Sequence, residues 1–298
     1  MMTWTPLPVL HGADGIPTGW LHSHWMIDPT VVLAAFALAA GYVLSTGTFN
    51  ARRADAADRV VSTRQRVSFL LGCLVFLVAL GPPIDDWSDN FLLSAHMAQH
   101  MLLMFVAAPL WLYGIPAWLL QPLAENRITN AIGYAVTRPV IALVVSNAMV
   151  IVWHVPAVYN RALLSEPVHV MQHGVFLFAA VVAWWPVLGP LPAWPKVSEP
   201  LQCLYLFLYS LPGSLVGAVI TYASVPMYDF YAQAPRIFGI SLEMDQELAG
   251  LIMWVGGSAI YFLWITIIFL RWGAREDEAE YGSRQSGSTV GASRVLPN

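Results

Sequence analysis

The sequence predicts an all-α polytopic membrane protein, a bundle of seven transmembrane helices. Of its 298 residues, 57% are hydrophobic and only 11% are charged, whereas a soluble domain carries about a quarter charged residues. Apolar runs that approach the length needed to span a bilayer, about 20 residues, recur seven times along the chain. Because backbone groups within lipid must be satisfied internally, we expect each run to form a helix.

The seven expected spans follow one another closely. We place them at residues 29–48, 66–81, 90–113, 138–154, 167–187, 201–223 and 246–271. The second and fourth runs are short, so we expect flanking residues to lengthen them. Pro109 and the pair Pro212-Gly213 lie inside spans and should kink or locally unwind them, because proline lacks an N–H group and its ring crowds the preceding turn.

The distribution of lysine and arginine predicts the orientation of this bundle. Twelve of the fourteen such residues fall on one side of the expected membrane, and only Arg161 and Arg236 fall on the other. Since cations concentrate on the cytoplasmic side, we expect a periplasmic N-terminus and a cytoplasmic C-terminus. Trp184 and Trp185 would then lie in an aromatic belt at the inner membrane surface.

This orientation divides the chain into three parts. Residues 1–28 are expected to form a periplasmic N-terminal tail, and they lack the cations of a cleavable signal peptide. Residues 29–272 form the seven-helix transmembrane domain. Residues 273–298 are small, polar and charged, so we expect a disordered cytoplasmic tail.

Composition excludes several classes of function. The chain has no basic patch suited to nucleic acid, and its only lysine, Lys196, lies in a loop where it would not form a retinal Schiff base within a helix. Cys73 and Cys203 form no C-x-x-C motif, so we interpret them as packing residues. No nucleophile–base triad or phosphate-binding loop is evident, and we expect a protein that is not an enzyme.

All eight histidines fall on the expected periplasmic side, and four of them form two like pairs. Each pair reads H-x-x-Q-H, and the pairs are His96/His100 and His169/His173. Residues four apart share a helix face, so two facing helices could direct up to four imidazoles at one spot. Imidazole binds copper, zinc, iron and nickel, and ionisable groups within membranes tend to be functional. The pairs predict a metal or haem site; the alternative is that these histidines merely bond one another or the backbone.

The depth of the two pairs decides whether they form one site. Counted from the expected helix starts, His100 lies about 15 Å and His173 about 9 Å along its helix. One shared site and two separate sites are therefore both open. His154 closes the fourth span on the same side, and His11, His22 and His24 belong to the N-terminal tail.

Methionine and glutamine accompany these histidines. Gln99 and Gln172 hold the same position in the two pairs and are candidates for orienting a neighbouring group. A stripe of methionines, Met97, Met101 and Met104, lies beside the first pair. Thioethers bind Cu(I), but methionine is also a common apolar filler, which is the interpretation we favour for the stripe.

The segment before the seventh span adds an acid and a long loop. Asp245 opens that span, where it either complements the helix N-terminus or pairs with a histidine or a metal ion. The loop 224–245 is rich in Tyr, Phe, Met and Pro. It either covers the histidines or lies in the membrane interface.

Several segments together resemble the family of caa3-type cytochrome c oxidase assembly factors, often called CtaG. They are H-M-A-Q-H with M-L-L-M-F-V-A-A-P-L (96–110), W-H-V-P-A-V-Y-N-R-A-L (153–163), H-V-M-Q-H (169–173) with W-W-P (184–186), and D-Q-x-L-A-G-x-I-M-W (245–254). The likeness covers most of residues 30–272. It implies a bacterial inner-membrane protein that handles copper at the periplasmic face while a haem-copper oxidase matures.

The resemblance also implies partners and site residues. The partners would be a haem-copper oxidase subunit and a periplasmic copper donor, within a lipid bilayer. Carried over to this chain, the metal residues would be His96, His100, His169 and His173, with His154 and Asp245 added.

Two other functions compete with this one. Histidines on facing helices could clamp the iron of a b-type haem, as in a quinone-linked oxidoreductase. A metal-ion transporter would also need metal ligands, but transporters place polar groups across the midplane. Here the inner half of every expected span is nearly free of ionisable side chains, which argues against a transport path.

Overall fold

The structure, a computed structural model, describes residues 28–52 and 59–292. Every regular element in these ranges is helical. Five helices are long and apolar enough to cross a membrane, or seven if each of two bent helix pairs counts as one span. The prediction of an all-helical, multi-span membrane protein is confirmed. The N-terminal tail up to residue 27, with His11, His22 and His24, lies outside the described residues.

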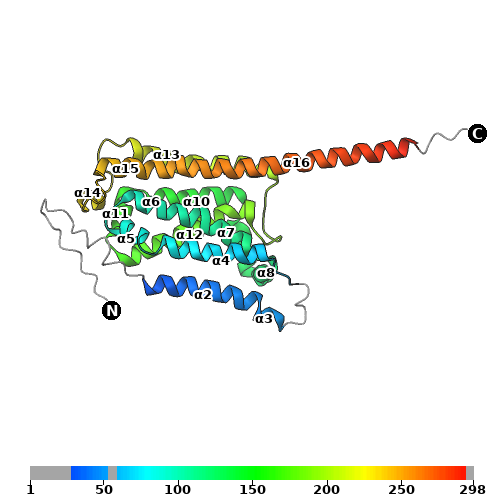
Figure 1. The fold of residues 1–298 in the computed structure, drawn as a ribbon, viewed down its shortest axis with the longest axis horizontal. Coiled ribbons are helices and arrows are strands. Elements are labelled where there is room, and N and C mark those ends of the chain that lie inside the picture. Colours follow the sequence, from blue (N-terminus) through cyan, green and yellow to red (C-terminus); the bar gives the residue numbers. More distant parts are fainter. Residues whose placement is uncertain (1–27, 53–58, 293–298) are drawn as a thin grey trace, which may run out of the picture.

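Seven long helical segments run back and forth along the bundle (Figure 1). They are α2 (Pro29–Thr46), α4 (Thr63–Ala79), α6–η2–α7 (Leu93–Leu102, Leu103–Ala107 and Ala108–Gly114), α10 (Pro139–Trp153), α12 (Glu166–Leu188), α13 (Glu199–Tyr222), and α15–η3–α16 (Leu242–Leu251, Ile252–Gly256 and Gly257–Ala292). Each overlaps one of the expected spans.

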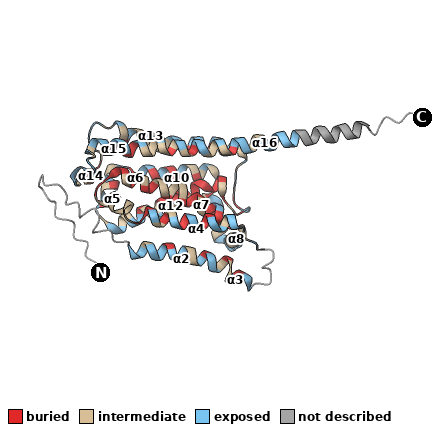
Figure 2. Cartoon of the chain, in the orientation of Figure 1, coloured by how far each residue is buried: buried red, intermediate tan, exposed pale blue. Residues whose placement is uncertain are grey.

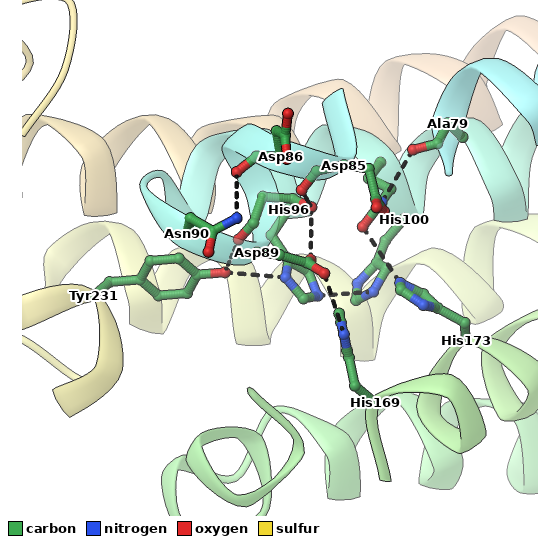
Figure 3. A network of polar contacts seen from close by, with 12 residues as sticks. Ala79, Asp85, Asp86, Asp89, Asn90, His96, His100, His169, His173 and Tyr231 are labelled. Carbon is green, nitrogen blue, oxygen red and sulfur yellow. Dashed lines mark hydrogen bonds and ion pairs between the residues drawn. The ribbon is translucent and has the colours of Figure 1, made fainter. Parts of the chain in front are cut away.

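Short helices close the two ends of the bundle. One end carries α5 (Ile84–Asn90), α11 (Pro156–Leu163) and α14 (Asp229–Gln233), and we call it the histidine end because the two histidine pairs lie beside these helices (Figures 1 and 3). The opposite end carries α3 (Thr48–Ala51) and α8 (Ala117–Glu125), with α9 (Arg127–Val136) following α8 along the chain.

Local capping explains where α4 begins. The Ser62 hydroxyl accepts a hydrogen bond from the Gln65 backbone N–H (3.2 Å), and the Gln65 side chain accepts one from the Ser62 backbone N–H (3.0 Å). This reciprocal capping box satisfies two free donors of the first turn. It lengthens the second span to residue 63, in line with our expectation that flanking residues would extend it.

The two prolines expected to disturb helices behave differently. Immediately before Pro109, residues Leu103–Ala107 form a π-helical turn, because proline offers no N–H to the carbonyl one turn earlier and its ring crowds that turn. The local unwinding expected at Pro109 is therefore confirmed. Around Pro212, by contrast, α13 continues as one helix from Glu199 to Tyr222.

The buried residues gather in the central segments, whereas α2 and α16 present mostly exposed surfaces (Figure 2). Trp184 and Trp185 belong to this core, at 2% and 5% exposure. The Trp184 indole donates a hydrogen bond to the Met104 carbonyl oxygen (3.0 Å), and Trp185 packs against Trp194. Both rings therefore face the inside of the bundle, a direction that hydropathy does not reveal, and their place in an aromatic belt stays a prediction.

The last helix runs past the expected end of the transmembrane domain. α16 continues without a break to Ala292, so the boundary placed at 272 does not mark a helix end. Residues 274–280 read A-R-E-D-E-A-E, and most of these are good helix formers. Arg275 forms an ion pair with Glu199 at the start of α13, which ties the extension to a neighbouring helix.

Two glycines allow α13 and α15 to approach closely. A Cβ atom placed on Gly217 would lie 2.7 Å from the Trp254 backbone nitrogen and 2.9 Å from the Gly250 carbonyl oxygen. Helices within membranes often pack through such small residues, because backbones then come into direct contact.

Gly217→Ala should therefore push these helices apart and destabilise the fold by about 1–3 kcal/mol, as overpacking does elsewhere. The measurement is the midpoint of thermal unfolding in detergent. Gly213→Ala in the same helix is the matched control, since a Cβ there meets nothing within 4 Å. Equal midpoints for the two variants would contradict the close contact.

Candidate metal centre

The two histidine pairs converge on one place at the histidine end. The ring centroids of His96 and His100 on α6 are 4.3 Å apart, and His96 lies 5.4 Å from His169 on α12. The His100 and His173 rings are also 5.4 Å apart. Figure 3 shows His169 and His173 approaching the first pair from a separate helix. The four imidazoles form a single group, which we call the histidine cluster.

The helix starts explain why the depths match. α6 begins at Leu93 and α12 begins at Glu166, so His100 and His173 each lie seven residues beyond the first residue of their helix. Seven residues correspond to about 10 Å along an α-helix in both cases. The mismatch expected from the sequence arose because the third span was taken to begin at residue 90.

Tyr231 determines which nitrogen of His96 carries a proton. Its hydroxyl donates to the Ser88 carbonyl oxygen (2.6 Å) and lies 3.0 Å from His96 Nδ1. Burial raises the pKa of Tyr231 well above its ordinary value, so the hydroxyl stays protonated. Because its single proton goes to Ser88, it accepts a hydrogen bond from His96 Nδ1–H. The other nitrogen of His96, Nε2, is then left with a free lone pair.

The Nε2 atoms of His96 and His100 face each other at 3.0 Å. Because Nε2 of His96 is the acceptor, His100 donates its Nε2 proton to it. Two nitrogens bound to one ion at about 2.0–2.1 Å also lie roughly 3 Å apart, so an ion could take the place of this proton with little movement of the rings. One ring nitrogen each of His96, His100 and His173 lie within 4.8 Å of one another.

Two acids on α5 complete the surroundings of the cluster. Asp89 Oδ2 lies 3.5 Å from His169 Nδ1, and Asp89, His96 and His169 form a second group whose ligand atoms lie within 4.8 Å of one another. Gln99 links Asp85 to the cluster: its amide nitrogen donates to Asp85 Oδ1 (2.8 Å), and its amide oxygen lies 3.3 Å from His173 Nε2. Carboxylate and amide partners of this kind orient metal-binding histidines.

These two acids and Tyr231 are not among the site residues predicted from the sequence. Asp85 and Asp89 are four residues apart, a spacing that places both on one helix face, and they directly precede the first histidine pair. That signal was available. Tyr231 had no comparable signal, because it lies in a long loop remote in sequence from His96.

Gln99 and Gln172 do not share a role despite their equivalent positions. The amide of Gln99 also donates to the Ala79 carbonyl oxygen (3.0 Å), so it joins α4 to the cluster. Gln172 is fully buried, and neither amide atom has a hydrogen-bond partner among the described residues.

His154 lies beside the cluster but is not part of either group of residues whose ligand atoms lie within 4.8 Å of one another. Its Nδ1 lies 2.7 Å from the Val150 carbonyl oxygen, and its buried Nε2 has no hydrogen-bond partner among the described residues. The rings of His154 and His100 both pack against Phe176, at centroid distances of 5.9 and 4.4 Å.

Asp245, which the family resemblance added with His154 to the expected metal residues, caps the start of α6. Its carboxylate is 0% exposed and accepts hydrogen bonds from the backbone N–H groups of Leu93 and Ser94, both at 2.9 Å. The Ser94 hydroxyl donates a third bond (2.6 Å), and Arg236 lies 3.6 Å away. Both carboxylate oxygens are therefore engaged at a helix N-terminus, where a negative charge is favourable.

The loop between α13 and α15 covers the histidine cluster. Tyr231 contacts His96 as described, and the Tyr228 hydroxyl donates to the His154 carbonyl oxygen (3.0 Å). Arg236 donates to the Phe91 carbonyl oxygen (2.9 Å), and Gln246 binds the backbone at Met227 (2.8 Å). Of the two positions considered for this loop, it takes the one over the cluster.

Comparison with known proteins identifies the family. The family model described as cytochrome c oxidase caa3 assembly factor (Caa3_CtaG) matches residues 40–275. This match covers most of the chain, which therefore belongs to that family. No curated protein and no solved structure gives a significant match.

Asp245→Ala should destabilise the protein by about 3–5 kcal/mol, because it leaves two buried N–H groups of α6 without their acceptor and Arg236 without its ion-pair partner. The measurement is thermal unfolding in detergent. The control is Glu247→Ala, which removes an exposed acid from the same helix. A small shift like that of the control would argue against a capping role.

Proposed function

We propose that this chain binds copper at the histidine cluster and supports the maturation of a haem-copper oxidase, acting as an assembly factor and not as an enzyme. Membership of the oxidase assembly family supports the oxidase as the client. The observation that carries the copper proposal is the convergence of His96, His100 and His173 from two helices, with ligand atoms within 4.8 Å.

The chemistry of the donors favours copper. Neutral imidazoles bind late first-row metals, and copper(II) forms the strongest complexes of the divalent series. Asp89 adds a carboxylate to the same cluster. A haem-copper oxidase needs copper in a membrane-buried site, so a donor whose ligands also lie within the helical bundle is well placed to supply it.

We further propose that the seven segments all span the cytoplasmic membrane of a bacterium, with the histidine end facing the periplasm. Among the described residues, ten of the twelve lysine and arginine residues lie at the opposite end or in the segments beyond it, as the cytoplasmic side should. At the histidine end, Asp85, Asp86 and Asp89 would attract metal cations. A periplasmic copper donor would deliver the ion there.

The crowding of the cluster favours a single ion over haem. His96 and His100 already contact each other, and Tyr231 and Gln99 hold His96 and His173 in place. A porphyrin between any two of these rings would have to displace the others. A visible spectrum separates the two ligands, because bound haem gives an intense Soret band.

Replacing His96 and His100 together by alanine should weaken copper binding by on the order of a hundredfold, since loss of a supporting residue alone costs 10–100-fold. The measurement is the metal content of the purified protein by atomic absorption, together with a competition titration. Met171→Leu is the control, because Met171 lies between His169 and His173 in sequence yet is 53% exposed. Unchanged copper content in the double variant would refute the cluster, and a Soret band would favour haem.

The orientation is tested by labelling single cysteines in intact cells. After Cys73 and Cys203 are replaced by alanine, Ser224→Cys introduces a thiol in the covering loop and Ser198→Cys introduces one just before α13, both at exposed positions. A membrane-impermeant maleimide should modify residue 224 in intact cells and residue 198 only after lysis. The reverse pattern would place the histidine end in the cytoplasm.

A further inference from the structure

A cavity adjoins the histidine cluster within the bundle, between α6, α10, α13 and the η3 turn. Its volume is about 60 Å³, enough for several water-sized occupants, since one water needs about 10–15 Å³. Its lining includes two histidines and four of the eleven methionines of the chain: His100, His154, Met97, Met101, Met104 and Met253.

Two of these methionines share a helix face with His100, since Met97, His100 and Met101 follow the spacing i, i+3, i+4. Met104 lies in the π-helical turn that follows and lines the same cavity. Opposite them, Gly257 offers no side chain, and the Met101 methyl group lies 3.6 Å from where a Cβ atom would stand. The Met101 side chain therefore reaches across the cavity to α16.

The two histidines bring nitrogens that bond nothing else. His100 Nδ1 and His154 Nε2 are buried and have no hydrogen-bond partner among the described residues. Buried polar atoms are nearly always paired in folded proteins. Two such atoms on residues that line one cavity point to a ligand that they would bind.

We propose that this cavity is a second metal position, selective for Cu(I), with the imidazoles of His100 and His154 and the thioethers of Met97, Met101 and Met104 as its donors. The proposal rests on the proposed copper function and extends it. Thioether sulfur is a soft ligand that favours Cu(I). Among the described residues that line the cavity, none is Asp or Glu.

The absence of an acid from this lining favours a monovalent ion. The cost of transferring an ion into a medium of low dielectric constant rises steeply with its charge, and a buried divalent ion needs nearby negative charge to offset it. The histidine cluster has Asp89 for that purpose, whereas the cavity offers only neutral donors. The two positions therefore differ in both charge and softness.

His100 belongs to both positions. Its Nε2 faces His96 in the cluster, and its Nδ1 is the free atom. A neutral imidazole has one lone pair, so His100 holds an ion through one nitrogen at a time. The two positions would therefore use different nitrogens of His100, and the ring proton would lie on whichever nitrogen is not bound.

X-ray absorption on the full-length protein in detergent tests the proposal. Cu(I) is supplied anaerobically with excess ascorbate, and Zn(II) is bound to a separate sample. We expect sulfur scatterers in the first coordination shell of Cu(I) and only nitrogen or oxygen around Zn(II). Cu(I) surrounded only by light atoms would overturn the proposal, and this result needs no variant.

Variants then separate the cavity from the cluster. The triple change Met97→Leu, Met101→Leu and Met104→Leu nearly conserves side-chain volume and should weaken Cu(I) binding about tenfold or more, with sulfur scattering lost and Zn(II) binding unchanged. Met171→Leu with Met244→Leu is the control, since these side chains are 53% and 50% exposed. Equal Cu(I) affinity in the triple variant would overturn the cavity site.

The variant His96→Ala shows which of the two proposed metal positions, the histidine cluster or the cavity, fails. It removes a ligand from the cluster and none from the cavity, so Zn(II) binding should fall while sulfur scattering around Cu(I) persists. Unchanged Zn(II) binding in this variant would count against the cluster, whatever the methionine variants show. Sulfur scattering lost in His96→Ala while Zn(II) binding is retained would overturn the assignment of donors to the cavity.

Discussion

The hydrogen bonds of Asp245 to the start of α6 are the constraint on which the site depends. Leu92, the residue before this helix, has no side chain that caps it, so the first donors of α6 are satisfied by a carboxylate from the other end of the sequence. These two hydrogen bonds fix the residue at which α6 begins and the rotation of α6 about its own axis. The position of His96, one turn further on, follows from both. Arg236 joins the same carboxylate to the loop that carries Tyr231, so the helix and the cover of the cluster are held by a single group.

Neighbouring side chains from several elements fix the orientation of the histidine rings. Tyr231 places the proton of His96 on Nδ1, Asp89 lies beside His169, and Gln99 bridges His173 to α4 and α5. Each partner comes from a different element than the histidine it contacts. The rings are therefore held by the fold itself, so the ion proposed above would bind with little loss of side-chain freedom. The arrangement also explains why both members of each H-x-x-Q-H pair face inward.

Much of the fold follows from the sequence, because long apolar runs have no alternative to helices in a bilayer. The sharing of a helix face by His96 and His100 follows equally from their spacing. The common depth of His100 and His173 does not, since it requires the true start of α6, and the capping group is about 150 residues away in sequence. The burial of Trp184 and Trp185, and the contact between Tyr231 and His96, are likewise products of tertiary packing. Asp85 and Asp89 are an intermediate case. Their spacing places both on one helix face, but the sequence does not reveal that they contact Gln99 and His169.

The π-helical turn at Leu103–Ala107 lets the two halves of one segment, α6 and α7, face in different directions. It inserts the equivalent of one residue, about 100° of rotation, between the imidazoles of α6 and the residues of α7. Beyond the turn, Trp111 lies over Gly72, and the backbone of α7 accepts hydrogen bonds from Ser68 and Tyr42. A regular helix would match the orientation of either the histidine half or the half that packs on α2 and α4, but not both. The irregularity lets the far half pack on the scaffold while the near half keeps the imidazoles of His96 and His100 directed at those of α12.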